Sequence, residues 1–305
     1  MNARNVLTIS LAGLMMVCGA LAQDELSTAY NDLKAASEAK KPPAEIKKLA
    51  EVAFATAKKN TGPVPADTDK DAWEARVKYA GDVSGFAEYA LYASAVAAPP
   101  AAAIDLFGYL EAQAPKSKYM GMAYPRYVQA LQQSGQTARV GPTAEKAVAA
   151  FPDDAQLLML AADYEMGKQQ ADRALGFAKR ASAILERHPK APEGVGAAEW
   201  ERQNASALGR AHYYAGLVYG TKRQFAECDK ELRPALALIK DNATFTANAY
   251  YWLGESNYAL GRQVMDRTQI NQGMKYLETA ATMSGPYREL ASTRLRGMKQ
   301  EMGMK

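Results

Sequence analysis

Apolar residues recur three and four positions apart along most of the chain after residue 24, which is the spacing of one face of an α-helix. Pro115, Pro152 and Pro189 stand 37 residues apart and then 37 again, and each closes a stretch that predicts two amphipathic helices. A pair of helices cannot bury its apolar face alone, so neighbouring pairs must stack on one another. The pattern therefore predicts an all-α solenoid of roughly six antiparallel helix pairs and a final capping helix.

Breaks in this pattern divide the chain into segments. Stretches rich in Gly and Pro interrupt the helical spacing twice, and we expect linkers there. The expected segments are a signal peptide at 1–22, an N-terminal helical hairpin at 23–60, a linker at 61–71, repeats at 72–189, a linker at 190–198, C-terminal repeats at 199–285, and a capping helix with a tail at 286–305.

One connection is longer than the others. The stretch from Arg262 to Gln272 is about seven residues longer than a tight repeat needs. It forms either a loop that touches a partner or a lengthened helix pair, because Val264, Ile270 and Met274 keep some apolar spacing.

The first 22 residues are typical of a secretory signal peptide. Arg4 gives a positive start, residues 6–17 form an apolar run, and Ala20-Leu21-Ala22 has the small-residue pattern of a cleavage site. The run is too short for a transmembrane helix, so we expect cleavage after Ala22 and an exported protein of the periplasm or cell envelope.

The positions of the two cysteines are consistent with an exported protein. Cys18 lies inside the leader, where lipid attachment is an alternative, although Val17 stands where lipoprotein signals carry a small residue. After cleavage Cys228 is the only thiol, which excludes an intramolecular disulfide. Its position in a helical pattern predicts a small buried side chain rather than a reactive one.

Charge is nearly balanced. The chain has 37 basic and 33 acidic residues. Removal of one Arg with the leader leaves 36 − 33 = +3, which does not indicate nucleic-acid binding. We expect membrane association only through partners or through a lipid on Cys18.

The residues offer little for catalysis. His188 and His212 have no Cys or carboxylate at metal-ligand spacing, and no nucleophile elbow, phosphate loop or dinucleotide motif occurs. Glu199 and Glu201 suit the start of an exposed helix. The sequence predicts no catalytic residue, no metal and no cofactor. A cell-wall glycosidase would need a further globular domain, for which no stretch remains.

Several of these motifs together resemble the tetratricopeptide repeat family. They are Leu253-Gly254 with Tyr250, Tyr258 and Gly261, and the Ala103-x3-Phe107-x2-Leu110-x4-Pro115 spacing. The resemblance covers about residues 80–286. The chain departs from the family in its longer period and in the absence of Leu-Gly from the two middle units.

The resemblance implies a right-handed superhelix in which the first helix of each pair lines a concave, partner-binding face. It gives the following candidates for that face: Arg126, Gln129, Gln132, Arg210, Tyr213, Leu217, Asn248, Tyr251, Glu255 and Tyr258. Tyr and Arg suit such a role, but tyrosines at helical spacing also pack between repeats.

We therefore expect a non-enzymatic interaction scaffold that binds a peptide or partner helix of unknown identity. Two alternatives stay open: an envelope-assembly subunit, with or without a lipid on Cys18, and a carrier of a small ligand.

Overall fold

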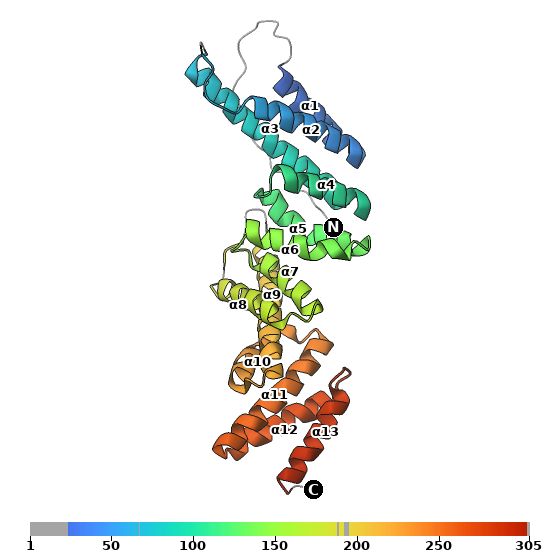
Figure 1. The fold of residues 1–305 in the computed structure, drawn as a ribbon, viewed down its shortest axis with the longest axis vertical. Helices are drawn as coiled ribbons and strands as arrows, with labels where there is room; N and C mark the ends of the chain where they lie inside the picture. Colours follow the sequence, from blue (N-terminus) through green and yellow to red (C-terminus); the bar gives the residue numbers. More distant parts are fainter. Residues whose placement is uncertain (1–23, 67, 188, 192–194, 304–305) are drawn as a thin grey trace. The chain divides into compact units, whose positions relative to one another are not determined.

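The structure of the chain is a computed structural model that describes residues 24–66, 68–187, 189–191 and 195–303. The predicted signal peptide, Cys18 and His188 lie outside the described residues. Figure 1 shows the order of the helices along the chain.

The described residues form thirteen α-helices and one short 3-10 helix, with no strand among them, which confirms the all-α prediction. The helices are α1 (Glu25–Glu38), α2 (Pro43–Lys59), α3 (Lys70–Ala97), α4 (Pro100–Gln113), α5 (Lys118–Gln133), η1 (Thr137–Arg139), α6 (Val140–Ala150), α7 (Ala155–Gly167), α8 (Ala171–Leu185), α9 (Ala197–Thr221), α10 (Phe225–Ile239), α11 (Ala243–Val264), α12 (Arg267–Thr282) and α13 (Arg288–Glu301).

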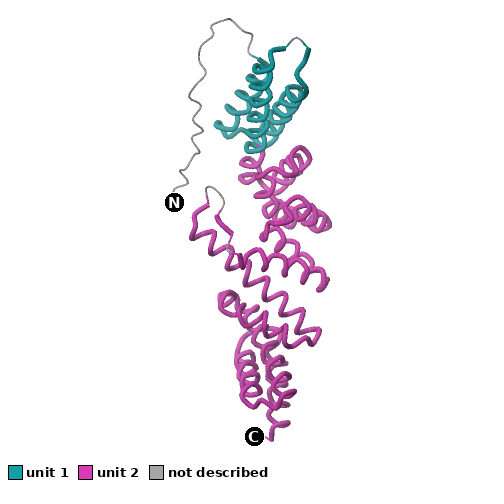
Figure 2. Tube along the Cα trace, turned by 90° about the vertical axis from the view of Figure 1, so that its left-hand side faces the viewer, with its two compact units in different colours: residues 1–90 teal, residues 91–305 magenta. Residues whose placement is uncertain are grey.

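The chain divides into two compact units (Figure 2). The first extends to Ala90 and the second starts at Leu91, so the division falls within α3 and not in the break at 61–71. In the first unit α1 packs on α2 through buried Leu26, Leu33 and Ile46. Tyr30 of α1 lies edge-on to Phe86 of α3, with ring centroids 5.2 Å apart.

In the second unit each helix from α4 to α13 contacts the next one along the chain. In addition, α5 contacts α7, α7 contacts α9, and α9 contacts α11. These four are the first helices of successive pairs. They therefore form one layer, and the second helices α6, α8, α10 and α12 each pack against the first helix of their own pair.

Side chains at the helix starts explain several boundaries. Asp154 accepts hydrogen bonds from the backbone N–H groups of Gln156 and Leu157, and Asp266 does the same for Thr268 and Gln269. Such caps satisfy backbone donors that a helix start leaves free.

Glycines allow the helices of two pairs to approach closely. A Cβ on Gly216 of α9 would lie 2.4 Å from Leu232 of α10, and one on Gly254 of α11 would lie 2.5 Å from Leu277 of α12. Gly254 follows Gly216 by 38 residues, whereas Leu277 follows Leu232 by 45, so the second of these pairs is seven residues longer.

Those seven residues extend the helices. Helix α11 ends at Val264 and α12 begins at Arg267, so only Met265 and Asp266 join them. The interpretation as a lengthened helix pair is therefore confirmed, and the interpretation as a loop was wrong.

Candidate functional site

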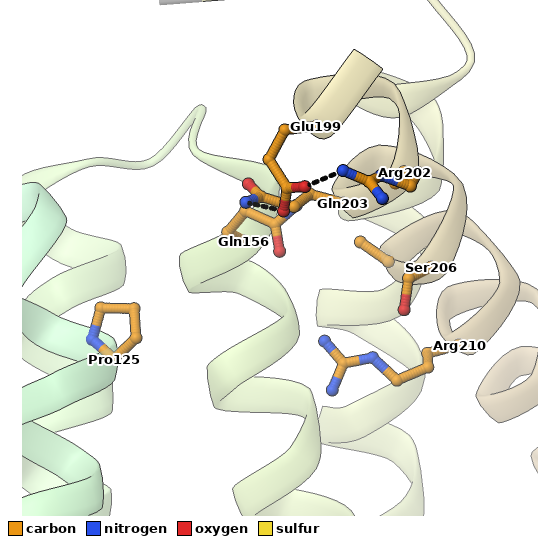
Figure 3. Close-up of a pocket in the computed structure, with 8 residues that line it drawn as sticks. Pro125, Gln156, Glu199, Arg202, Gln203, Ser206 and Arg210 are labelled. Atoms are coloured by element: carbon orange, nitrogen blue, oxygen red, sulfur yellow. Dashed lines mark hydrogen bonds and ion pairs between the residues drawn. The ribbon is translucent and has the colours of Figure 1, made fainter. Parts of the chain in front are cut away.

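An open pocket of about 510 Å³ lies on the layer of first helices in the second unit (Figure 3). It is lined by one residue of α5, one of α7 and six of α9. The lining residues are Pro125, Gln156, Glu199, Arg202, Gln203, Ser206, Ala207 and Arg210.

Local structure sets the positions of these side chains. The Asp154 cap fixes the start of α7, which places Gln156 in its first turn. The residues of α9 from Glu199 to Arg210 are spaced three or four apart, so they lie on one face of that helix. Trp200 steadies the helix start by donating from its indole nitrogen to the carbonyl of Pro189 at 2.6 Å.

Both arginines of the pocket are paired with carboxylates. Arg210 donates from Nη1 to Asp163 of α7 at 2.8 Å, and the Tyr214 hydroxyl donates to the same carboxylate at 2.7 Å. Arg202 pairs with Glu199, which also accepts from Gln203 at 3.0 Å. The charges of the pocket are therefore balanced.

Two polar atoms of the pocket are buried without a hydrogen-bond partner in the described structure: Nε of Arg210 and Nε2 of Gln156. Both are donors, and leaving a buried donor unpaired costs about 1–3 kcal/mol. Both atoms are shielded from solvent, so a peptide carbonyl would accept from them only after the side chains turn toward the pocket.

The structure separates the ten predicted residues by exposure. Arg126, Gln129 and Gln132 are exposed on α5, next to Pro125 of the pocket. Arg210, Leu217 and Glu255 are partly buried, whereas Tyr213, Asn248, Tyr251 and Tyr258 are buried. Arg210 is the one predicted residue that lines the pocket.

The buried residues form contacts between successive first helices. Tyr213 of α9 accepts a hydrogen bond from the Asn248 amide of α11 at 3.0 Å, and the ring of Phe245 stacks on Tyr213 with centroids 4.3 Å apart. In the described structure these side chains are packed, as the alternative for the tyrosines supposed. Their partner-binding role stays a prediction.

Helix α13 covers the predicted residues of α11 in the same way. Tyr287 stacks on Tyr251 at 4.5 Å, Arg294 pairs with Glu255 at 2.8 Å, and the Tyr258 hydroxyl donates to Glu301 at 2.7 Å. Burial raises the pKa of Tyr251 to about 12. Burial also raises the pKa of Glu255, against the opposing effect of Arg294.

His212 has carboxylate neighbours that the sequence analysis missed. Its Nδ1 lies 2.6 Å from Glu231 of α10, and its Nε2 lies 3.6 Å from Glu186, just after α8. No local motif could show this, since the nearer carboxylate is 19 residues away in sequence. Within the described residues, no group of three or more His, Cys, Asp or Glu side chains is placed so that it could hold a metal ion.

The pocket itself was also missed. Glu199 was interpreted as part of an exposed helix start, which is where it lies. The polar residues 199, 202, 203, 206 and 210 share a helical face, and this was the signal available in the sequence. That face meets Gln156 and Pro125 only because α5, α7 and α9 pack together.

No protein-family model matches the sequence, and no curated protein matches it either. None of the described helices combines the length and the apolar composition that crossing a bilayer would require.

Proposed function

We propose that the chain is a non-enzymatic interaction scaffold of tetratricopeptide-repeat type that is exported to the periplasm or cell envelope. Its second unit binds a peptide or a partner helix along the first helices α5, α7 and α9. The observation that carries this proposal is the pocket, because three successive first helices each contribute side chains to it.

The contents of the pocket support a polypeptide ligand. The unpartnered donors of Arg210 and Gln156 match the carbonyl oxygens that a peptide chain offers. The exposed polar side chains Arg126, Gln129 and Gln132 extend the same surface along α5. Specificity would then accumulate over several helices, as in other groove-binding proteins.

A carrier of a small ligand is the second candidate. The pocket volume of about 510 Å³ lies in the range of small-molecule sites, which is about 300–1,000 Å³. Small-molecule sites bury most of their ligand, whereas this pocket is open, which favours a polypeptide. A metabolite that raises the melting temperature of the parent but not of Arg210→Ala would favour the carrier instead.

Site-specific photo-crosslinking in cells tests the scaffold proposal. A photoreactive amino acid at Ser206, in the pocket, or at Gln129, on α5, should capture the same partner. The matched control is Ala237, which is exposed on the second helix α10. Arg210→Ala should abolish capture at Ser206 while circular dichroism stays unchanged.

The possible results separate clearly. Capture of one partner at Ser206 and Gln129 but not at Ala237 supports the proposal. Capture at Ala237 alone, or equal capture at all three positions, contradicts it. The envelope-assembly alternative gains support if a captured partner is a membrane protein. A change in electrophoretic mobility in Cys18→Ser would then reveal a lipid.

A further inference from the structure

Five first helices end in the same kind of turn. After each helix one residue has a positive φ angle between 51° and 71°. The following N–H bonds to a carbonyl five residues earlier, which is the Schellman motif. The positive-φ residues are Lys40 after α1, Gly135 after α5, Gln169 after α7, Arg223 after α9 and Met265 after α11.

The turn after α11 differs from the other four in its side chains. At the positive-φ position it carries Met265, where the others carry Lys, Gly, Gln and Arg. The preceding residue is Val264, where the others have Ala39, Ser134, Lys168 and Lys222. Val264 is 70% exposed and Met265 is 82% exposed, the highest values among the large apolar side chains of the described residues.

This turn also lies at the end of the lengthened pair. Met265 follows Gly254 by eleven residues, whereas Arg223 follows Gly216 by seven. The other three residues lie in α12 before its packing leucine, since Leu277 follows Arg267 by ten residues and Leu232 follows Phe225 by seven. Four residues add about 6 Å of helix, so the added length places Val264 and Met265 one turn further from the close-packed glycine than in the α9–α10 pair.

Basic groups flank the two apolar side chains. Arg267 is exposed in the first turn of α12, and Arg262, in the last turn of α11, forms an ion pair with Glu301 at 3.3 Å. The one acidic residue between them, Asp266, directs its carboxylate to the N–H groups of Thr268 and Gln269. Because Arg262 is paired with Glu301, Arg267 is the basic residue of the tip that forms no ion pair within the described structure.

We propose that this tip, Val264 and Met265 with Arg267, docks onto an anionic lipid bilayer surface. Exposed apolar side chains at the end of a helix pair can enter the interface without help from the rest of the chain, and Arg267 is attracted to anionic headgroups. The contact is peripheral, and it does not depend on the pocket or on a lipid at Cys18.

A local fluorescence measurement tests the proposal on the full-length chain carrying Cys18→Ser. An environment-sensitive dye is attached to Gln263→Cys, beside the tip, or to Gln169→Cys, in the matching turn after α7. Vesicles of one part phosphatidylglycerol to two parts phosphatidylcholine should raise and blue-shift the emission at 263 but not at 169. Because the leader is common to both proteins, the difference reports on the tip.

Two variants complete the test. Val264→Ser with Met265→Ser should remove the response at 263, and Arg267→Glu should weaken it at least several-fold at low salt. These side chains are exposed, so helicity and melting temperature should not change.

The proposal is overturned if the dye at 263 does not respond, if 169 responds equally, or if the double serine variant keeps the response. Concentration-dependent self-association of the parent that the double variant loses would also overturn it, because a second copy would then cover the tip. Photo-crosslinking at Ser206 is unaffected in either case, so this test and that of the scaffold fail separately.

Discussion

Arg76 of α3 donates hydrogen bonds to the carboxylate of Asp24 from both terminal nitrogens of its guanidinium, at 2.9 and 2.8 Å. Its Nε donates to the side-chain oxygen of Asn60, the residue after α2. One side chain of α3 therefore joins the start of α1 to the end of α2. Asp24, Asn60 and Arg76 all belong to the first compact unit.

The ion pair between Arg76 and Asp24 makes the packing of α1 depend on pH. Hydrogen bonds from Arg76 are the main cause of a lowered pKa of Asp24, whose ordinary value is 3.8. The stabilisation is therefore complete above pH 3.8 and is lost as the pH falls through the lower folded value. Both side chains are more than one-third exposed, which limits the contribution to about 1 kcal/mol.

We expect Arg76→Ala to speed hydrogen exchange of α1 about 5-fold at pH 6, and this effect to diminish as the pH falls through the lowered pKa of Asp24. Lys70→Ala, which removes an exposed pair with Glu74, is the control. Equal effects of the two variants on α1 would show that the Asp24 contact has no special role.

Gly254→Ala should destabilise the second unit by about 1–3 kcal/mol, because the new methyl group would overlap Leu277 and approach the carbonyl of Gly273. Gly176→Ala in α8 is the matched control, since nothing lies within 4 Å of its Cβ position. That variant should be neutral or should stabilise by about 0.5–1 kcal/mol. Urea unfolding measures both, and the order of the two variants is the decisive result.

Gln169→Gly should stabilise the chain by about 0.5–1 kcal/mol, because glycine adopts the positive φ of 59° without the steric cost that a Cβ brings. Gln169→Ala keeps the Cβ and serves as control, with a change near zero. The opposite substitution, Gly135→Ala, should lower the free energy of unfolding by about 1 kcal/mol. A loss of stability in Gln169→Gly would contradict this account of the turns.

The Cys228 thiol should be inert in the folded protein. Its side chain is fully buried, and burial raises its pKa to about 12. Relative to an ordinary thiol near pKa 9, the reactive thiolate is about 1,000-fold scarcer at neutral pH. A disulfide reagent applied to Cys18→Ser should label Cys228 only in denaturant, whereas an added Gln263→Cys should react at once in the folded chain.

Arg294 compensates the partly buried carboxylate of Glu255. Arg294→Ala should weaken the docking of α13 by about 1–3 kcal/mol at neutral pH, because it leaves a partly buried charge unpaired. Burial already raises the pKa of Glu255, so acidification should protonate it early and reduce the defect. Adding Glu255→Gln to Arg294→Ala should restore protection of α13 from hydrogen exchange. If it does not, the two residues act independently.

The sequence by itself determined that the chain is helical and where most of its helices end. Apolar spacing, prolines and capping residues act within one or two turns, so their effects can be predicted locally.

Only the tertiary structure decided which polar faces meet. A stripe with Tyr251 and Tyr258 has the same spacing whether it faces solvent or packs on α13, and here it packs. His212 and Glu231 are brought together by the packing of α9 on α10. The pocket joins α5, α7 and α9, whose separation depends on how the helices cross and not on any local pattern.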